Sequence, residues 1–258
     1  MTNYFFFIKN FFNFENFIKY RYPISFFWVF LFLNPVIFSG LAGDDSYNSM
    51  VQGGEIYYSR AWYDSFFSEI EGWLRGAGRI NVFYGLILRS FFYITHDILI
   101  TKIVVLTVVA TTVIVFGHIV ENLCGSKNIS FLSMFLIPLL CQFRNWHDPI
   151  LGFFIIIPLT TLLCFSSYYY YLKFSSEKKI KNYVFSIILF ILSVLSYEIA
   201  FAFSAVYFFN ILFSKNKKIE FFYILLALSA IIFSRGFNLY TGEMHTYKNS
   251  IPVFDINV

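Results

Sequence analysis

Long apolar runs separated by short polar segments form the pattern of this chain. The first run, residues 24–42, is interrupted only by Ser25, Asn34 and Ser39. At about 1.5 Å per residue, a helix over this run is long enough to cross a bilayer core of about 30 Å. The runs that we expect to cross a membrane are residues 24–42, 98–120, 131–143, 150–172 and 221–234, with two short helices within 183–213. The pattern therefore predicts an all-α polytopic membrane protein with about seven transmembrane helices.

Basic residues near the ends of the runs indicate the orientation, because lysine and arginine are biased toward the cytoplasmic side of a membrane. The first run is preceded by Lys9, Lys19 and Arg21. Residues 1–23 are therefore expected in the cytoplasm, and Asp44 and Asp45 outside it. Residues 40–42, Gly-Leu-Ala, resemble a signal-peptide cleavage site, but the segment before the apolar run is long for a signal peptide, which favours a retained helix.

Two lysine clusters, at residues 173–181 and 215–218, indicate two further cytoplasmic loops. The largely apolar residues 183–213 between them must leave the cytoplasmic side and return to it. We predict a hairpin of two short helices, or one buried re-entrant element, with Glu198 at its outer turn. A single helix would bury Glu198 in the membrane and place the two clusters on opposite sides.

Residues 80–95 are the ambiguous segment, because counting them as a span would put the four-lysine loop outside. We predict a helix that lies in the outer interface, with Arg89 off its apolar stripe. That stripe consists of Ile80, Phe83, Ile87 and Phe91. The predicted organisation is a cytoplasmic N-terminus at 1–23, a transmembrane core at 24–234 with an outer loop at 43–97, and an extracytoplasmic tail at 235–258.

The composition excludes an ordinary soluble domain. Hydrophobic residues make up 58% of the chain, charged residues 13%, and the mean hydropathy is +0.66. A soluble domain has about twice this share of charged residues. The net charge of +4 comes from loop lysines, and no basic run with interleaved aromatic residues indicates a nucleic-acid partner. The three cysteines, Cys124, Cys141 and Cys164, predict neither a disulfide framework nor a zinc site.

The two adjacent carboxylates Asp44 and Asp45 follow the first apolar run directly. A carboxylate at the water interface stays charged at little free-energy cost. The low-dielectric membrane beside it strengthens its electric field and can raise its pKa. This setting suits a general base that faces a membrane-bound substrate. The alternative is that the pair ends a helix and starts a solvated loop.

Three further polar groups are expected on the same outer face. They are Trp73 to Arg79, which includes Arg75; Arg144 to Pro149, which includes His147 and Asp148; and Ser196-Tyr197-Glu198. Arginine binds phosphate bidentately, as lysine does not. Alternatively, the arginines anchor at headgroups, Asp148 caps the next helix and Glu198 pairs with a neighbouring arginine. Asp97, after His96, is expected to cap the second span, and His118 and Glu121 to be structural groups on the cytoplasmic side.

These residues resemble a known family. A first span that ends in Asp-Asp at the start of a large outer loop, as at Asp44-Asp45, is characteristic of the GT-C superfamily of membrane glycosyltransferases. The element from Trp73 to Arg79 is similar to the Trp…Gly-Arg element of GtrII-type glucosyltransferases and related bacterial sugar-transfer proteins. Ser196-Tyr197-Glu198 resembles the Ser-Lys-Glu hairpin tip of some relatives, with Tyr197 in place of the lysine. Family members usually continue beyond the seventh span, which leaves open whether this chain is the whole enzyme or its N-terminal core.

The resemblance implies a GT-C-like core in the inner (cytoplasmic) membrane. It implies transfer of a sugar from a polyprenyl-phosphate-linked donor to a cell-surface glycan or lipid acceptor on the extracytoplasmic face. Asp44 or Asp45 would act as the base on the acceptor hydroxyl, and Arg79 and Arg144 would bind the donor phosphate. The other candidate substrate-binding residues are Arg75, His147, Asp148 and Glu198. No cofactor is implied, and the need for a divalent metal is left open.

The alternatives are a transporter or flippase of lipid-linked glycan, a degenerate family member, and a glycan polymerase. A transporter should carry ionisable residues near the middles of its spans. In this sequence they gather at the predicted outer face, which favours interfacial chemistry.

Overall fold

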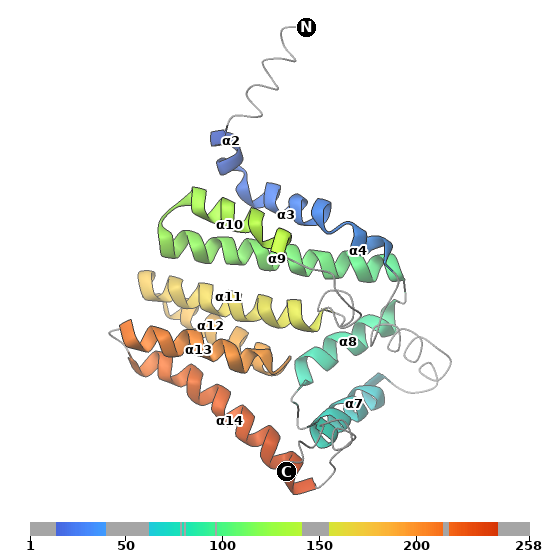
Figure 1. Ribbon diagram of the computed structural model, residues 1–258. Helices are drawn as coiled ribbons and strands as arrows, with labels where there is room; N and C mark the ends of the chain where they lie inside the picture. The colour runs from blue at the N-terminus through green and yellow to red at the C-terminus, as the bar shows by residue number, and fades with distance from the viewer. Residues whose placement is uncertain are drawn as a thin grey trace, which may run out of the picture. The chain divides into compact units, whose positions relative to one another are not determined.

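The computed structural model describes residues 14–39, 62–77, 79, 81–95, 97–140, 155–213 and 217–241 (Figure 1). Throughout these residues the regular elements are helices and no strand occurs, which confirms the predicted all-α class. The chain forms two compact units. Unit 1 comprises residues 1–47 and 96–189, and unit 2 comprises residues 48–95 and 190–258.

Helices in both units overlap the predicted spans. In unit 1 the described helices are α2 (Phe14–Lys19), α3 (Arg21–Phe32), α4 (Pro35–Phe38), α9 (Ile98–Cys124), α10 (Lys127–Leu140), α11 (Ile156–Glu177) and most of α12 (Ile180–Val194). In unit 2 they are α7 (Trp62–Ala77), α8 (Val82–Ile94), the end of α12, α13 (Ile199–Phe213) and α14 (Lys217–Thr241).

Helix α9 is the central helix of unit 1, since α3, α4, α10 and α11 all contact it. The Asp97 side chain caps its first turn and accepts a 2.9 Å hydrogen bond from the backbone N–H of Ile100, as predicted. Gly125 ends the helix with φ of 64°, a left-handed conformation that glycine adopts without a steric cost. Among the described helices, α9 alone is long and apolar enough, by length and composition, to cross a membrane.

The helices around α9 alternate in direction. Helix α3 is antiparallel to α9, because its start contacts the end of α9 through the Arg21–Glu121 pair while its end packs on the middle of α9. Helix α10 returns antiparallel after Gly125. Helix α11 is parallel to α9, as shown by ring contacts at Phe116–Phe165 and His118–Tyr169. The core among these helices consists of Val29, Leu33, Val36, Leu106, Val109, Ala110, Val113 and Met134.

Gly117 allows α10 to approach α9 closely. The Ser130 hydroxyl donates a 2.8 Å hydrogen bond to the Gly117 carbonyl. A Cβ at Gly117 would overlap the side chain of Met134, which is fully buried. Small residues at such crossings let two helix backbones come together, and hydroxyls then bond across the contact.

A second hydroxyl contact joins α11 to α12. Ser167 Oγ donates to the Ser186 carbonyl at 2.8 Å, and Ser186 Oγ donates to the Ser167 carbonyl at 2.7 Å. Both serines are fully buried, so each hydroxyl satisfies its hydrogen-bonding capacity at the helix contact itself. The left-handed Lys178 (φ 56°) provides the tight turn between the two helices.

The first apolar run differs from the single helix expected over residues 24–42. Helix α3 ends at Phe32, and the short helix α4 starts at Pro35. Proline lacks the N–H that would continue the helical ladder. The chain instead makes tighter bonds, from Val36 N–H to the Leu33 carbonyl (3.0 Å) and from Ile37 N–H to the Asn34 carbonyl (2.9 Å). Residues 40–42 lie outside the described residues.

The predicted hairpin is two helices, as expected. Helix α12 ends at Val194 and α13 starts at Ile199, so Glu198 lies in the turn between them. Three buried aromatic rings hold the end of α12 to α13 and α14. Tyr207 and Tyr223 stack at 4.0 Å between centroids, and Phe190 meets them edge-on at 5.4 and 5.3 Å.

Helix α8 confirms the predicted helix in the ambiguous segment, and side chains other than those of the predicted stripe pack inside the protein. Phe83, Ile87 and Phe91 of the predicted stripe are only partly buried, and Ile80 lies outside the described residues. The buried large apolar side chains of α8 are instead Tyr84, Leu88 and Phe92, and Arg89 lies on this side with 8% of its surface exposed. Apolar residues occur on almost every side of this helix, so the sequence pattern does not show which side is buried. Packing against neighbouring segments decides that.

Candidate functional site

Arg79 and Glu198, both predicted for the outer face, form an ion pair in unit 2. Arg79 Nε lies 2.5 Å from Glu198 Oε1. The two side chains keep 24% and 29% of their surface exposed, so a ligand can reach the pair. Sequence reasoning had kept such a pairing as an alternative to substrate binding for Glu198, and the structure shows the pairing.

Backbone hydrogen bonds bring these two distant segments together. Beyond the end of α7, the Arg79 N–H donates to the Trp73 carbonyl at 3.1 Å and turns the chain back over the helix. At the start of α8, the Phe83 N–H donates to the Leu195 carbonyl at 2.8 Å. The start of α8 is thereby fastened to the turn that carries Glu198.

Two aromatic rings accompany the guanidinium group. Arg79 Cζ lies 5.7 Å from the ring centroid of Trp73 and 5.7 Å from that of Tyr197. Cations at this distance from a ring are attracted by its π electrons. Tyr197 precedes Glu198 in the turn, so the ion-pair partner of Arg79 and one of its two rings come from adjacent residues.

The geometry leaves Arg79 able to bind a second anion. Glu198 engages the guanidinium at Nε, whereas the group carries five N–H donors. A bidentate oxyanion needs two parallel donors, and arginine supplies these in a rigid plane. The carboxylate and the two rings therefore orient a cation without exhausting its donors.

The other predicted site residues are placed less fully. Arg75 lies in the last turn of α7, close in sequence to Arg79. Five lie outside the described residues, namely Asp44, Asp45, Arg144, His147 and Asp148. Within the described ranges, no group of three or more His, Cys, Asp or Glu side chains comes together as a metal site would require.

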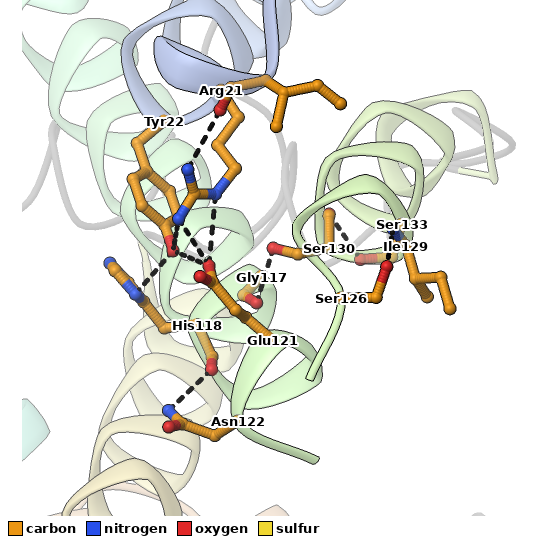
Figure 2. Close-up of polar contacts among 11 residues, drawn as sticks. Arg21, Tyr22, Gly117, His118, Glu121, Asn122, Ser126, Ile129, Ser130 and Ser133 are labelled. Carbon is orange, nitrogen blue, oxygen red and sulfur yellow. Dashed lines mark hydrogen bonds and ion pairs between the residues drawn. The ribbon is translucent and has the colours of Figure 1, made fainter. Parts of the chain in front are cut away.

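A second polar cluster lies in unit 1, where the start of α3 meets the end of α9 (Figure 2). Arg21 Nη2 donates to Glu121 Oε2 at 2.6 Å, and Arg21 Nε donates to the same oxygen at 3.1 Å. The Tyr22 hydroxyl donates to Glu121 Oε2 at 2.6 Å and lies 2.8 Å from His118 Nδ1. The Tyr22 and His118 rings stack at 4.0 Å.

Counting protons assigns the histidine tautomer. The single Tyr22 proton points to Glu121, so the close contact with His118 requires a proton on Nδ1 that is donated to the tyrosine oxygen. Burial, followed by the hydrogen bond to Glu121, raises the pKa of Tyr22 to about 12. The phenol therefore stays protonated across the physiological pH range.

Sequence reasoning treated His118 and Glu121 as structural and missed their partner Tyr22. Two sequence features could have indicated this cluster. Arg21 and Tyr22 stand just before the first apolar run, and His118 and Glu121 stand three residues apart at the end of the run 98–120. Residues three apart share one face of a helix. Nothing local shows that these two faces meet, because the meeting depends on the antiparallel packing of α3 and α9.

We expect this cluster to stabilise the packing of α3 on α9. Glu121→Leu should lower the free energy of unfolding by about 1–2 kcal/mol, because it leaves the largely buried Arg21 without its carboxylate. Adding Arg21→Met should recover part of that loss. Thermal unfolding in detergent measures both effects, and Glu177→Gln, at an exposed ion pair, is the matched control with little expected change. A Glu121→Leu protein as stable as the wild type would contradict this assignment.

Comparisons with protein-family models, with curated proteins and with solved structures found no match to this chain.

Proposed function

We propose that this chain is a polytopic inner-membrane protein with a GT-C-like core that transfers a sugar from a polyprenyl-phosphate-linked donor. The acceptor is a cell-surface glycan or lipid on the extracytoplasmic face. The observation that carries the proposal is Arg79, held by Glu198, Trp73 and Tyr197 at the turn between two short helices. An oriented, partly exposed guanidinium is suited to a lipid-linked phosphate.

Exposed apolar side chains support the membrane placement. Large apolar side chains face outward on successive helices, and a soluble protein rarely leaves so many in water. They include Leu99, Ile100 and Ile103 on α9, Val184, Phe185 and Ile188 on α12, and Phe221, Leu225, Leu228 and Ile232 on α14. The alternating directions of α3, α9 and α10 also support repeated membrane crossings.

The proposed reaction exchanges one bond at the anomeric carbon. Asp44 or Asp45 removes the proton of the acceptor hydroxyl, whose oxygen then attacks the anomeric carbon of the donor sugar. The bond from that carbon to the phosphate oxygen breaks, and the polyprenyl phosphate leaves with the electron pair. Arg79 and Arg144 stabilise the charge that develops on the phosphate. Arg75, His147 and Asp148 are the further substrate-binding groups of this proposal.

Arg79 provides the test, because its proposed role depends on the guanidinium plane. Arg79→Ala should weaken use of a polyprenyl-phosphate sugar by about 10–100-fold, and Arg79→Lys should weaken it measurably but less. The measurement is turnover of that donor by the purified protein at varied donor concentration. Arg21→Lys, in the cluster of unit 1, is the control and should leave donor use unchanged. Full function in Arg79→Lys would remove the phosphate role of this residue.

A transporter or flippase of lipid-linked glycan is the main rival. Two fully buried ionisable residues were overlooked in the sequence, Lys102 in α9 and Glu220 in α14. Each lies near the start of its helix and not near the middle. Their placement therefore does not provide the mid-membrane ionisable site that a transporter of this kind would use.

A further inference from the structure

Basic side chains gather at one end of unit 1, in a set that we call the inner basic rim. The rim consists of Lys19, Arg21, Lys127, Lys173, Lys178, Lys179 and Lys181. The helix directions bring these residues together, because α3 and α10 start at this end, α9 and α11 finish there, and α12 starts after a tight turn. The Arg21–Glu121 ion pair joins α3 to α9 at this end, and the ring contact of His118 with Tyr169 joins α9 to α11.

The rim carries more positive charge than its acids neutralise. The acidic residues at this end are Glu15, Glu121 and Glu177, against the seven cations of the rim. Glu121 pairs with Arg21 at 2.6 Å and Glu177 with Lys179 at 2.8 Å. The surplus is therefore carried mainly by lysines that extend from the ends of α10, α11 and α12.

Aromatic rings lie beneath several of these lysines. Lys173 Nζ is 4.9 Å from the Tyr169 ring centroid, and Lys178 Nζ is 5.9 Å from that of Phe174. The hydrogen bond with Tyr169 raises the pKa of Lys173, so this lysine stays charged. Lysine and tyrosine together at the ends of apolar helices are typical of the headgroup layer of a membrane.

The surface beside the rim decides what kind of partner it fits. Ile180, between Lys179 and Lys181, is 69% exposed, and Phe185, about one helical turn later, is 51% exposed. Ile129, two residues after Lys127, is 49% exposed. A nucleic acid or an acidic soluble protein would leave these apolar side chains in water. A leaflet with anionic headgroups covers both the charged rim and the apolar surface that adjoins it.

We propose that the inner basic rim binds anionic phospholipid headgroups of the cytoplasmic leaflet and selects them over zwitterionic ones. This property is separate from sugar transfer and rests only on the membrane placement of the proposed function. Loss of transfer activity would leave it untouched.

The test uses the full chain in nanodiscs of phosphatidylcholine, with or without phosphatidylglycerol. The wild-type Tm should be higher by about 5 °C when phosphatidylglycerol is present, and high salt should reduce the difference. A triple variant, Lys173→Gln, Lys178→Gln and Lys181→Gln, should lose most of the difference while keeping the wild-type Tm in phosphatidylcholine. The matched variant with arginine at the same three positions should keep the difference, because charge is retained.

Two results would overturn the proposal: equal wild-type Tm values in the two lipid compositions, or a full difference in the glutamine variant. Inorganic phosphate is the remaining comparison. If it raised the Tm in phosphatidylcholine as much as phosphatidylglycerol does, the rim would bind free phosphate and the lipid assignment would be wrong.

Discussion

Replacing Asp44 and Asp45 by asparagine is expected to lower sugar transfer by about 10²–10⁴-fold while leaving the protein in the membrane. Asparagine keeps the size of the side chain and can still form hydrogen bonds, but it cannot take up the proton of the sugar-acceptor hydroxyl. If one acid is the base, its single variant should lose as much activity as the double variant. The measurement is turnover of a polyprenyl-phosphate sugar by purified protein of matched expression level.

Asp97→Asn is the matched control for this experiment. Asp97 follows the same outer loop in sequence, but its side chain caps α9, and asparagine is also a good N-cap residue. Its replacement should leave transfer close to the wild-type rate. Near-normal transfer in both single variants and in the double variant would show that Asp44 and Asp45 are not the base. They would then only begin a solvated loop.

The second large effect is expected at the contact between α9 and α10. Gly117→Ala places a methyl group into the volume of the Met134 side chain, which is fully buried. Overpacking of this kind costs about 1–3 kcal/mol. Thermal unfolding in detergent should show a lower Tm, by about 2–4 °C for each kcal/mol in a chain of this size.

The assignment of this cost to Met134 is testable by a double-mutant cycle. Met134→Ala alone should destabilise the protein by about 2–5 kcal/mol through the cavity that it leaves. In the double variant the alanine at 117 occupies part of that cavity, so the combined loss should be smaller than the sum. Gly85→Ala is the control, since no heavy atom lies within 4 Å of the Cβ that it adds. Additive losses at 117 and 134 would show that the two side chains do not compete for space.

The sequence by itself determined most of the helices, because their signals are local, but it predicted neither α7 nor the break between α3 and α4. The lengths of the apolar runs indicated α9, α11 and α14, and the polar residues around Glu198 indicated the break between α12 and α13. The Asp97 cap needed only the nearest turn of chain. The lysine pattern predicted the helix directions, since charge bias acts on each loop separately.

Tertiary packing decided which side chains meet. The buried face of α8 was decided by its neighbours, because its apolar residues give no single stripe. Tyr22 joins His118 and Glu121 only because α3 packs antiparallel to α9. Arg79 and Glu198 are far apart in sequence, and their pairing depends on the bond that fastens α8 to the hairpin turn. Composition shows that such charged groups need partners near a membrane, but the choice among several arginines and acids depends on distances that exist only in the folded chain.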